Sequence, residues 1–310
     1  MIGMKRIKNI GLNCLTRKRI IIFVVSISLF LNFLTFLSSL SYPTTLGARD
    51  FSAYYFGAWK LLHNPEKVYT EGYPFSTTYK YLPSFLLMML PFMLLNYQTA
   101  FFIFDIFQFL LLPIMALMLH RMFSNKHVLV IALILIIVLI QPLPPFYIDR
   151  IDSTWVQFSF WVDYQNTFSR SYYSQWGNAN AKVFITFLLV LSLYLAYRKK
   201  SYLSGAVFAL AFFDPRFAVI SIPLAILYNQ GRVQKFLVAF AITFVSTNSI
   251  VLYSTIGAQF MHALSENSQT PMFSYGWIPL YTIIALTAVN FGNLKTFFIG
   301  GWRKRVLRKR

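Results

Sequence analysis

Long apolar runs joined by short basic connections are the feature of this sequence that most limits its fold. The first run, IIIFVVSISLFLNFLTFLSSL at residues 20–40, is as long as the ~20 apolar residues that a helix needs to cross a bilayer. Hydrophobic residues make up 57% of the 310-residue chain and charged residues only 12%, which is more apolar surface than a soluble domain of this length can bury. The sequence therefore predicts an all-α polytopic membrane protein.

We expect a bundle of about eight transmembrane helices, of which two form a short hairpin at 202–228. Pro215 disfavours a helical residue before it, and both flanks of this segment are basic, so a break at Asp214-Pro215-Arg216 is predicted. Residues 81–95 contain two prolines and are too short for a span, so they are predicted to be an interfacial or re-entrant helix on the outer side. Full spans are predicted at about 20–40, 98–119, 128–146, 179–197, 236–255 and 275–292.

The positive charge is distributed in a way that predicts orientation. The formal net charge is +19, and the Lys and Arg residues lie mostly in the connections and at both ends, as the positive-inside rule describes. This pattern favours the cell membrane as the location, with cytoplasmic termini and the lipid bilayer as a partner, and argues against nucleic acid. The whole chain, 1–310, is predicted to be one membrane domain with outer loops at about 41–97, 147–177 and 256–274.

Asp50 directly follows the first predicted span, where an ionisable group needs a partner or a function. It could cap the amphipathic helix predicted for DFSAYYFGAWKLL, present its carboxylate to a cavity, or do both. Arg49 is interpreted as an interfacial anchor or a phosphate contact, and Lys182 as a snorkelling residue or a phosphate contact. Asp214 and Arg216 are close enough in sequence to pair with each other.

The aromatic residues of 147–177 are explained either by a belt at the lipid interface or by a sugar-stacking surface. The three aspartates of that loop lack the spacing of a known metal-binding loop, so no metal or cofactor is predicted. Cys14 is the only cysteine, which excludes an internal disulfide. His262, in the last outer loop, is either a surface residue or a substrate contact.

Two stretches of the chain resemble one family. RDFSAYYFGAWKLL, with the later Tyr69 and the stretch YKYLPSFLLMMLPFMLL, is similar to the N-terminal region of glycosyltransferase family 87. These enzymes are GT-C-type α-mannosyltransferases that use polyprenyl-phosphate mannose. The block from Trp176 to Tyr228 looks like that family's Gly-Gln-x-Asn span and hairpin, although Gly177-Asn178-Ala179-Asn180 and Asp214 depart from the family pattern.

The resemblance implies a GT-C-like bundle and an inverting sugar transfer on the outer face, with mannose as the expected sugar. It implies a polyprenyl- or dolichyl-phosphate sugar as donor and a glycan or glycolipid as acceptor. Asp50 matches the acidic residue in the first outer loop of such enzymes and would be the general base, with Arg49, Lys182 and Arg216 binding the donor phosphate. The substrate-binding candidates are Tyr54, Tyr55, Tyr81, Trp176, Asn178 and His262.

Two other functions remain open at this point. The chain is short for the family, which would suit a catalytically inactive relative that serves as a membrane scaffold or assembly subunit. A transporter or flippase would more often show two matching broken helices in inverted halves, and the sequence has one broken pair.

Overall fold

The computed structural model describes residues 49–70, 79–123, 181–252 and 254–267, together with isolated helical positions at 23, 26, 30, 283, 284, 286, 287 and 290. Within these residues the fold is all-helical and contains no strand, as predicted. The elements are α3 (Arg49–His63), η1 (Pro65–Lys67), α4 (Pro83–Met89), η2 (Leu90–Leu94), α5 (Tyr97–Met122), α8 (Lys182–Tyr197), α9 (Ser201–Ala211), α10 (Pro215–Tyr228), α11 (Val233–Asn248), η4 (Ser249–Leu252) and α12 (Ser254–Asn267).

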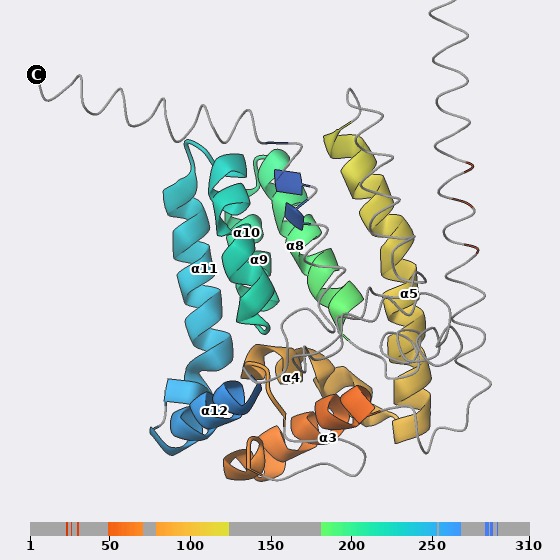
Figure 1. The fold of residues 1–310 in the computed structure, drawn as a ribbon, viewed down its shortest axis with the longest axis vertical. Helices are drawn as coiled ribbons and strands as arrows, with labels where there is room; N and C mark the ends of the chain where they lie inside the picture. The colour runs from red at the N-terminus through yellow and green to blue at the C-terminus, as the bar shows by residue number, and fades with distance from the viewer. Residues whose placement is uncertain are drawn as a thin grey trace, which may run out of the picture.

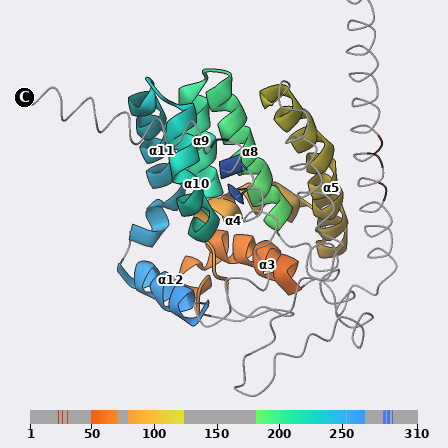
Figure 2. The same cartoon turned by 45° about the horizontal axis from the view of Figure 1, so that its top comes forward.

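The helices form an upright bundle with a transverse layer at one end. Figures 1 and 2 show α5, α8, α9, α10 and α11 side by side, while α3, α4 and α12 gather across the lower end in Figure 1. Basic residues from three connections therefore share the upper end, where Arg232 donates to the Lys199 carbonyl and Arg198 approaches the end of α5. The ends of α5, α8 and α10 thus lie at one end of the bundle, and the side of a membrane to which this end belongs stays a prediction.

Among the helices that the structure describes, α5 is the one that is long and apolar enough to cross a membrane. It has 26 residues and is capped by Asn96, whose side chain accepts a hydrogen bond from the Thr99 backbone N–H at 2.9 Å. The predicted span at 98–119 thus lies within helix α5. The other apolar helices of the described part are shorter; α8 and α11 have 16 residues each, fewer than predicted for the spans at 179–197 and 236–255.

The predicted hairpin is confirmed as two helices with a break before Pro215. Chain reversal occurs at 212–214, and Pro215 then occupies the first turn of α10, where its missing N–H costs nothing. At the upper end, Ser192 of α8 donates to the Ser204 carbonyl at 2.9 Å, and the Asn229 side chain donates to the Ser204 hydroxyl at 3.2 Å. These polar contacts join α8, α9 and the end of α10 inside an otherwise apolar bundle.

Gly205 allows α9 and α11 to approach each other closely. A Cβ built at Gly205 would lie 2.1 Å from the carbonyl oxygen of Phe236 and 3.0 Å from the Phe240 nitrogen. Both atoms belong to the backbone of α11, so no side-chain rotation relieves the overlap. Small residues at helix contacts commonly serve this purpose in bundles.

We therefore predict that Gly205→Ala lowers thermal stability in detergent, by about 1–3 kcal/mol, because the helices must separate. Helix propensity alone predicts the opposite sign, a gain of up to ~1 kcal/mol. Ala206→Gly, at the neighbouring and half-buried position, measures the propensity effect by itself. A melting temperature of Gly205→Ala at or above that of the wild type would contradict the close contact.

The transverse layer is held to the bundle by aromatic packing. Phe51, Tyr54, Phe85 and Phe104 are all buried, and Phe85 stacks on Phe213 of the hairpin with ring centroids 4.5 Å apart. The backbone N–H of Leu82 donates to the Phe213 carbonyl at 3.0 Å. The residues before α4 are thus fixed directly against the hairpin tip.

Several predictions need correction or lie outside the described residues. The predicted outer loop at 256–274 begins as helix α12, because Ile256, Phe260 and Ala263 form a buried stripe at helical spacing that the sequence analysis overlooked. The predicted span at 236–255 ends instead at Asn248, where η4 follows. The prediction of a short helix within 81–95 is confirmed by α4 and η2. The predictions for 20–40, 128–146, 147–177 and 275–292 fall on residues that are not described, apart from isolated helical positions.

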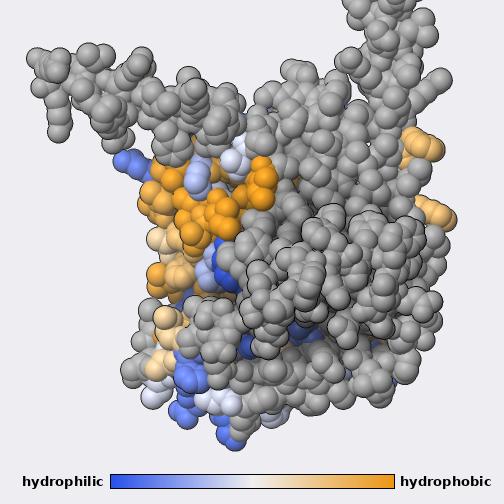
Figure 3. All heavy atoms as spheres, in the orientation of Figure 1, coloured by the Kyte–Doolittle hydropathy of each residue, from blue (hydrophilic) through white to orange (hydrophobic). Residues whose placement is uncertain are grey.

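Apolar side chains are exposed on the outer sides of the bundle. On α5 they form one helical stripe, Ile106, Leu110, Ile114 and Leu117. Figure 3 shows hydrophobic residues gathered where α9, α10 and α11 lie, and hydrophilic residues at the end that holds α12. The exposed apolar residues of those three helices include Leu203, Val219, Ile220, Leu237, Val238, Ile242 and Val245.

Candidate functional site

A buried ion cluster lies at the lower tip of the hairpin. Arg216 forms a bidentate pair with Asp214, with its Nε and one terminal nitrogen each 2.8 Å from a carboxylate oxygen. Lys182, at the first position of α8, places its Nζ 3.6 Å from the same carboxylate. Asp214 is 1% exposed and Lys182 is 6% exposed. The pairing of Asp214 with Arg216 is therefore confirmed, and Lys182 joins it.

The cluster carries one negative and two positive charges in a place where charge is expensive. Burial alone would raise the pKa of the Asp214 carboxyl, but Lys182 and Arg216 outweigh burial, so its pKa lies below the ordinary value. Lys182 also stands at the N-terminus of α8, where the helix dipole is itself positive. The N-terminus of α10 follows Asp214 directly. Two cations and two helix N-termini thus surround a single carboxylate.

Tyr81 connects this cluster to α3. Its ring lies 5.9 Å from the Lys182 Nζ, 5.7 Å from the Phe213 ring centroid and 5.9 Å from that of Tyr54. The Tyr81 carbonyl accepts a hydrogen bond from the Tyr69 hydroxyl at 3.0 Å, which fixes the backbone at this position. An aromatic wall therefore runs from the hairpin tip to the first turns of α3.

Tyr54 is the next residue of this wall and it is completely buried. Burial raises the pKa of its hydroxyl well above the ordinary value, and the neighbouring Tyr81 and the Asp50 carboxylate raise it further. The hydroxyl lies close to the Ala181 backbone, just before Lys182, but makes no hydrogen bond of standard geometry within the described residues. A buried hydroxyl in this state is a donor that a ligand or water can satisfy.

Asp50 lies in the first turn of α3, half-buried, one helical turn before Tyr54. Residues four apart share a face of a helix, and the Asp50 carboxylate raises the pKa of the Tyr54 hydroxyl. The structure thus brings Tyr54, Tyr81, Lys182 and Arg216 together around Asp214 at the lower end, and Asp50 lies next to Tyr54 on α3.

The remaining predicted site residues have different positions. The Tyr55 hydroxyl donates to the Leu95 carbonyl at 2.7 Å, and its ring packs against Tyr97, so it anchors α3 to the start of α5. His262 is exposed on α12. Arg49 is the first residue of α3, but its side chain is outside the described part of the structure. Trp176 and Asn178 are also outside the described residues.

Two buried polar residues of α5 were missed by the sequence analysis. Asp105 and Gln108 are fully buried, and their side-chain oxygens lack hydrogen-bond partners among the described residues. They follow Phe104 in the sequence, whose ring centroid lies 6.4 Å from that of Tyr54. The carboxylate of Asp105 within the apolar run at 98–119 is the sequence feature that could have indicated them.

Comparisons with protein-family models, with curated proteins and with solved structures each find no match. The chemistry of the site must therefore be judged from its own residues. Two cations, two helix N-termini and a buried tyrosine hydroxyl suit an anionic group such as phosphate. The nearby Asp50 carboxylate suits the acceptance of a proton.

Proposed function

We propose that this chain is a membrane glycosyltransferase of the GT-C type. In this proposal it moves a sugar, expected to be mannose, from a polyprenyl- or dolichyl-phosphate donor to a glycan or glycolipid acceptor on the outer face of the cell membrane. The observation that carries the proposal is the convergence of Lys182, Arg216 and the N-termini of α8 and α10 beside the Asp50–Tyr54 face of α3. The exposed apolar stripe on α5 supports placement in a membrane.

The reaction needs one base and one anion site. Asp50 would take the proton of the acceptor hydroxyl while that oxygen forms its bond to the anomeric carbon. The bond from that carbon to the donor phosphate breaks, and the phosphate leaves with the electron pair. A lipid phosphate already carries negative charge, so it needs cations and N–H donors rather than an acid. Lys182 and Arg216 would supply this stabilisation, and a single displacement inverts the sugar.

Asp214 sets the electrostatic balance of the proposed anion site. Without a ligand, it neutralises one of the two cations and keeps both in place. The remaining positive charge and the Tyr54 hydroxyl would then be available to the donor phosphate. This arrangement explains how two cations can remain buried before the donor binds.

The test is transfer by the full chain in membranes that contain a labelled polyprenyl-phosphate mannose and a glycolipid acceptor fraction. We expect wild-type protein to release free polyprenyl phosphate together with a labelled product. Membranes without the protein measure the background. Failure of the wild type with every lipid-phosphate sugar offered would contradict the proposed activity.

A scaffold function is the second candidate, and one observation favours it. Lys182 and Arg216 both already contact Asp214, so the cluster can stabilise the hairpin without any ligand. An inactive relative would bind another membrane protein and show no transfer. Stable co-purification of a partner, combined with absence of transfer, is the result that would select this function.

We also predict the orientation of the bundle. In a Cys14→Ser background, Glu66→Cys lies at the end that carries the candidate site, and Lys200→Cys lies at the basic end; both positions are exposed. Because Lys- and Arg-rich connections stay in the cytoplasm, a membrane-impermeant maleimide should label position 66 in intact cells and position 200 only after permeabilisation. Labelling of both positions from the same side would rule out this topology.

A further inference from the structure

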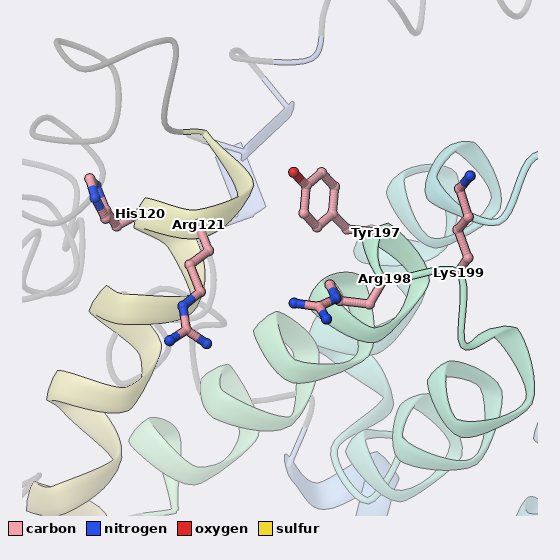
Figure 4. Close-up of a pocket in the computed structure, with 5 residues that line it drawn as sticks. All are labelled: His120, Arg121, Tyr197, Arg198 and Lys199. Carbon is pink, nitrogen blue, oxygen red and sulfur yellow. The ribbon is translucent and has the colours of Figure 1, made fainter.

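A basic pocket lies at the opposite end of the bundle from the candidate site. It has a volume of about 750 Å³ and is formed where α5 ends and α8 ends. Its lining residues are all exposed, and four of the five carry or can carry positive charge: His120, Arg121, Tyr197, Arg198 and Lys199. Figure 4 shows the Arg198 side chain extending from α8 toward α5, while the Arg121 side chain runs down along α5.

These cations have no acidic partner in the described part of the chain. The ion pairs found there involve Asp214, at the other end of the bundle. The Tyr194 hydroxyl lies between the two arginines; it accepts a hydrogen bond from Arg198 at 3.3 Å and also faces Arg121. Two arginines that line the same pocket without a carboxylate repel each other, and an anion placed between them removes that repulsion.

Lys199 provides independent support for a role of this pocket. Among the described residues other than glycine, Lys199 is the one with a positive φ, which is 63°. It is the second residue after the end of α8. Helices usually place glycine there, because a side chain in the left-handed region is strained. In the connection that follows α10, the residue with positive φ is Gly231, with φ 80°, three residues after the end of that helix. A lysine at this position puts a positive charge at the rim of the pocket at a cost in backbone energy.

The position of the pocket indicates the source of the anion. The exposed apolar stripe of α5 reaches Leu117, one turn before Arg121, and exposed Tyr202 and Leu203 begin α9 beside Lys199. The pocket thus lies where the apolar surface ends, at the depth of the phosphate groups of lipids in a membrane-embedded bundle. A phosphate diester with acyl chains fits both surfaces, whereas a soluble phosphate uses only the cations.

We propose that this pocket binds the head-group phosphate of an anionic phospholipid on the cytoplasmic side of the membrane. Arg121 and Arg198 hold the phosphate oxygens, and Lys199 adds positive charge at the rim of the pocket. This inference rests on the membrane placement proposed above but not on sugar transfer. Loss of lipid binding with normal transfer, or the reverse, therefore separates the two proposals.

The test measures lipid binding to the full chain in a neutral detergent by native mass spectrometry. We expect wild-type protein to bind phosphatidylglycerol at least about tenfold more tightly than phosphatidylcholine. The double variant Arg121→Gln/Arg198→Gln should lose this preference. The matched control Lys200→Gln/Lys235→Gln removes the same charge at the same end, outside the pocket, and should keep it.

A second variant distinguishes binding from folding. Lys199→Gly relieves the positive φ, so its melting temperature should equal or exceed that of the wild type, while its affinity for phosphatidylglycerol should fall by about fivefold. Equal retention of phosphatidylglycerol by the wild type and the double arginine variant would overturn the proposal. Displacement of the lipid by glycerol 3-phosphate or inorganic phosphate at matching concentrations would overturn the lipid as the source of the phosphate.

Discussion

Asp50→Asn should reduce sugar transfer from a lipid-phosphate donor by about 10²–10⁴-fold while the protein still folds. The amide has nearly the same size and can still accept a hydrogen bond at the first turn of α3, but it cannot take a proton from the acceptor hydroxyl. The change should lower the turnover rate much more than the affinity for the donor, because the proposed phosphate contacts come from Lys182 and Arg216. Initial rates of transfer in membranes, at varied donor concentration, measure both quantities.

Glu66→Gln is the matched control for this substitution. Glu66 is exposed, belongs to the same end of the molecule and loses the same charge when changed. It should transfer sugar at the wild-type rate, and both variants should melt at nearly the same temperature as the wild type. If Asp50→Asn keeps a third or more of wild-type activity, Asp50 is not the base and the proposed mechanism is wrong.

Asp214→Ala should destabilise the protein by about 3–5 kcal/mol, the largest effect on stability that we expect from a single substitution here. Its removal leaves Lys182 buried beside Arg216, both without this carboxylate, at the tip where the hairpin meets α4. Lys182→Met removes one of those charges and keeps the apolar stem. The double variant Asp214→Ala/Lys182→Met should therefore be more stable than the sum of the two single changes predicts.

The pH dependence of this stabilisation follows from the lowered pKa of Asp214. Because the carboxyl has a lower pKa in the folded protein than in the unfolded chain, its contribution is fully present above the ordinary value of ~3.9. It is lost as the pH falls through the folded-state pKa. The stability difference between wild type and Asp214→Asn should thus be constant from about pH 5 to pH 8 and shrink below about pH 4. A difference that disappears near neutral pH would contradict the ion cluster.

The sequence predicted the structure best where a proline, a charged flank or a short segment directly limits the backbone. Pro215 and the basic flanks predicted a break in the hairpin, and α9 and α10 meet there. The prolines and short length of 81–95 predicted a short helix, which is present as α4 and η2. In contrast, α12 was interpreted as part of a loop, because its stripe of three buried residues gains its meaning only from the surface on which it packs.

The sequence by itself determined the helical class, the hairpin break and a short set of charged candidates, because prolines, apolar runs and charge positions act over a few neighbouring residues. Only the tertiary structure showed that Lys182 reaches Asp214 across 32 positions of the chain and that Tyr81 joins them to Tyr54. It also showed that Arg121 and Arg198 line one pocket at the other end of the bundle. Such contacts depend on how separate helices pack, and the packing is fixed by shape, as at Gly205 against α11, rather than by local sequence.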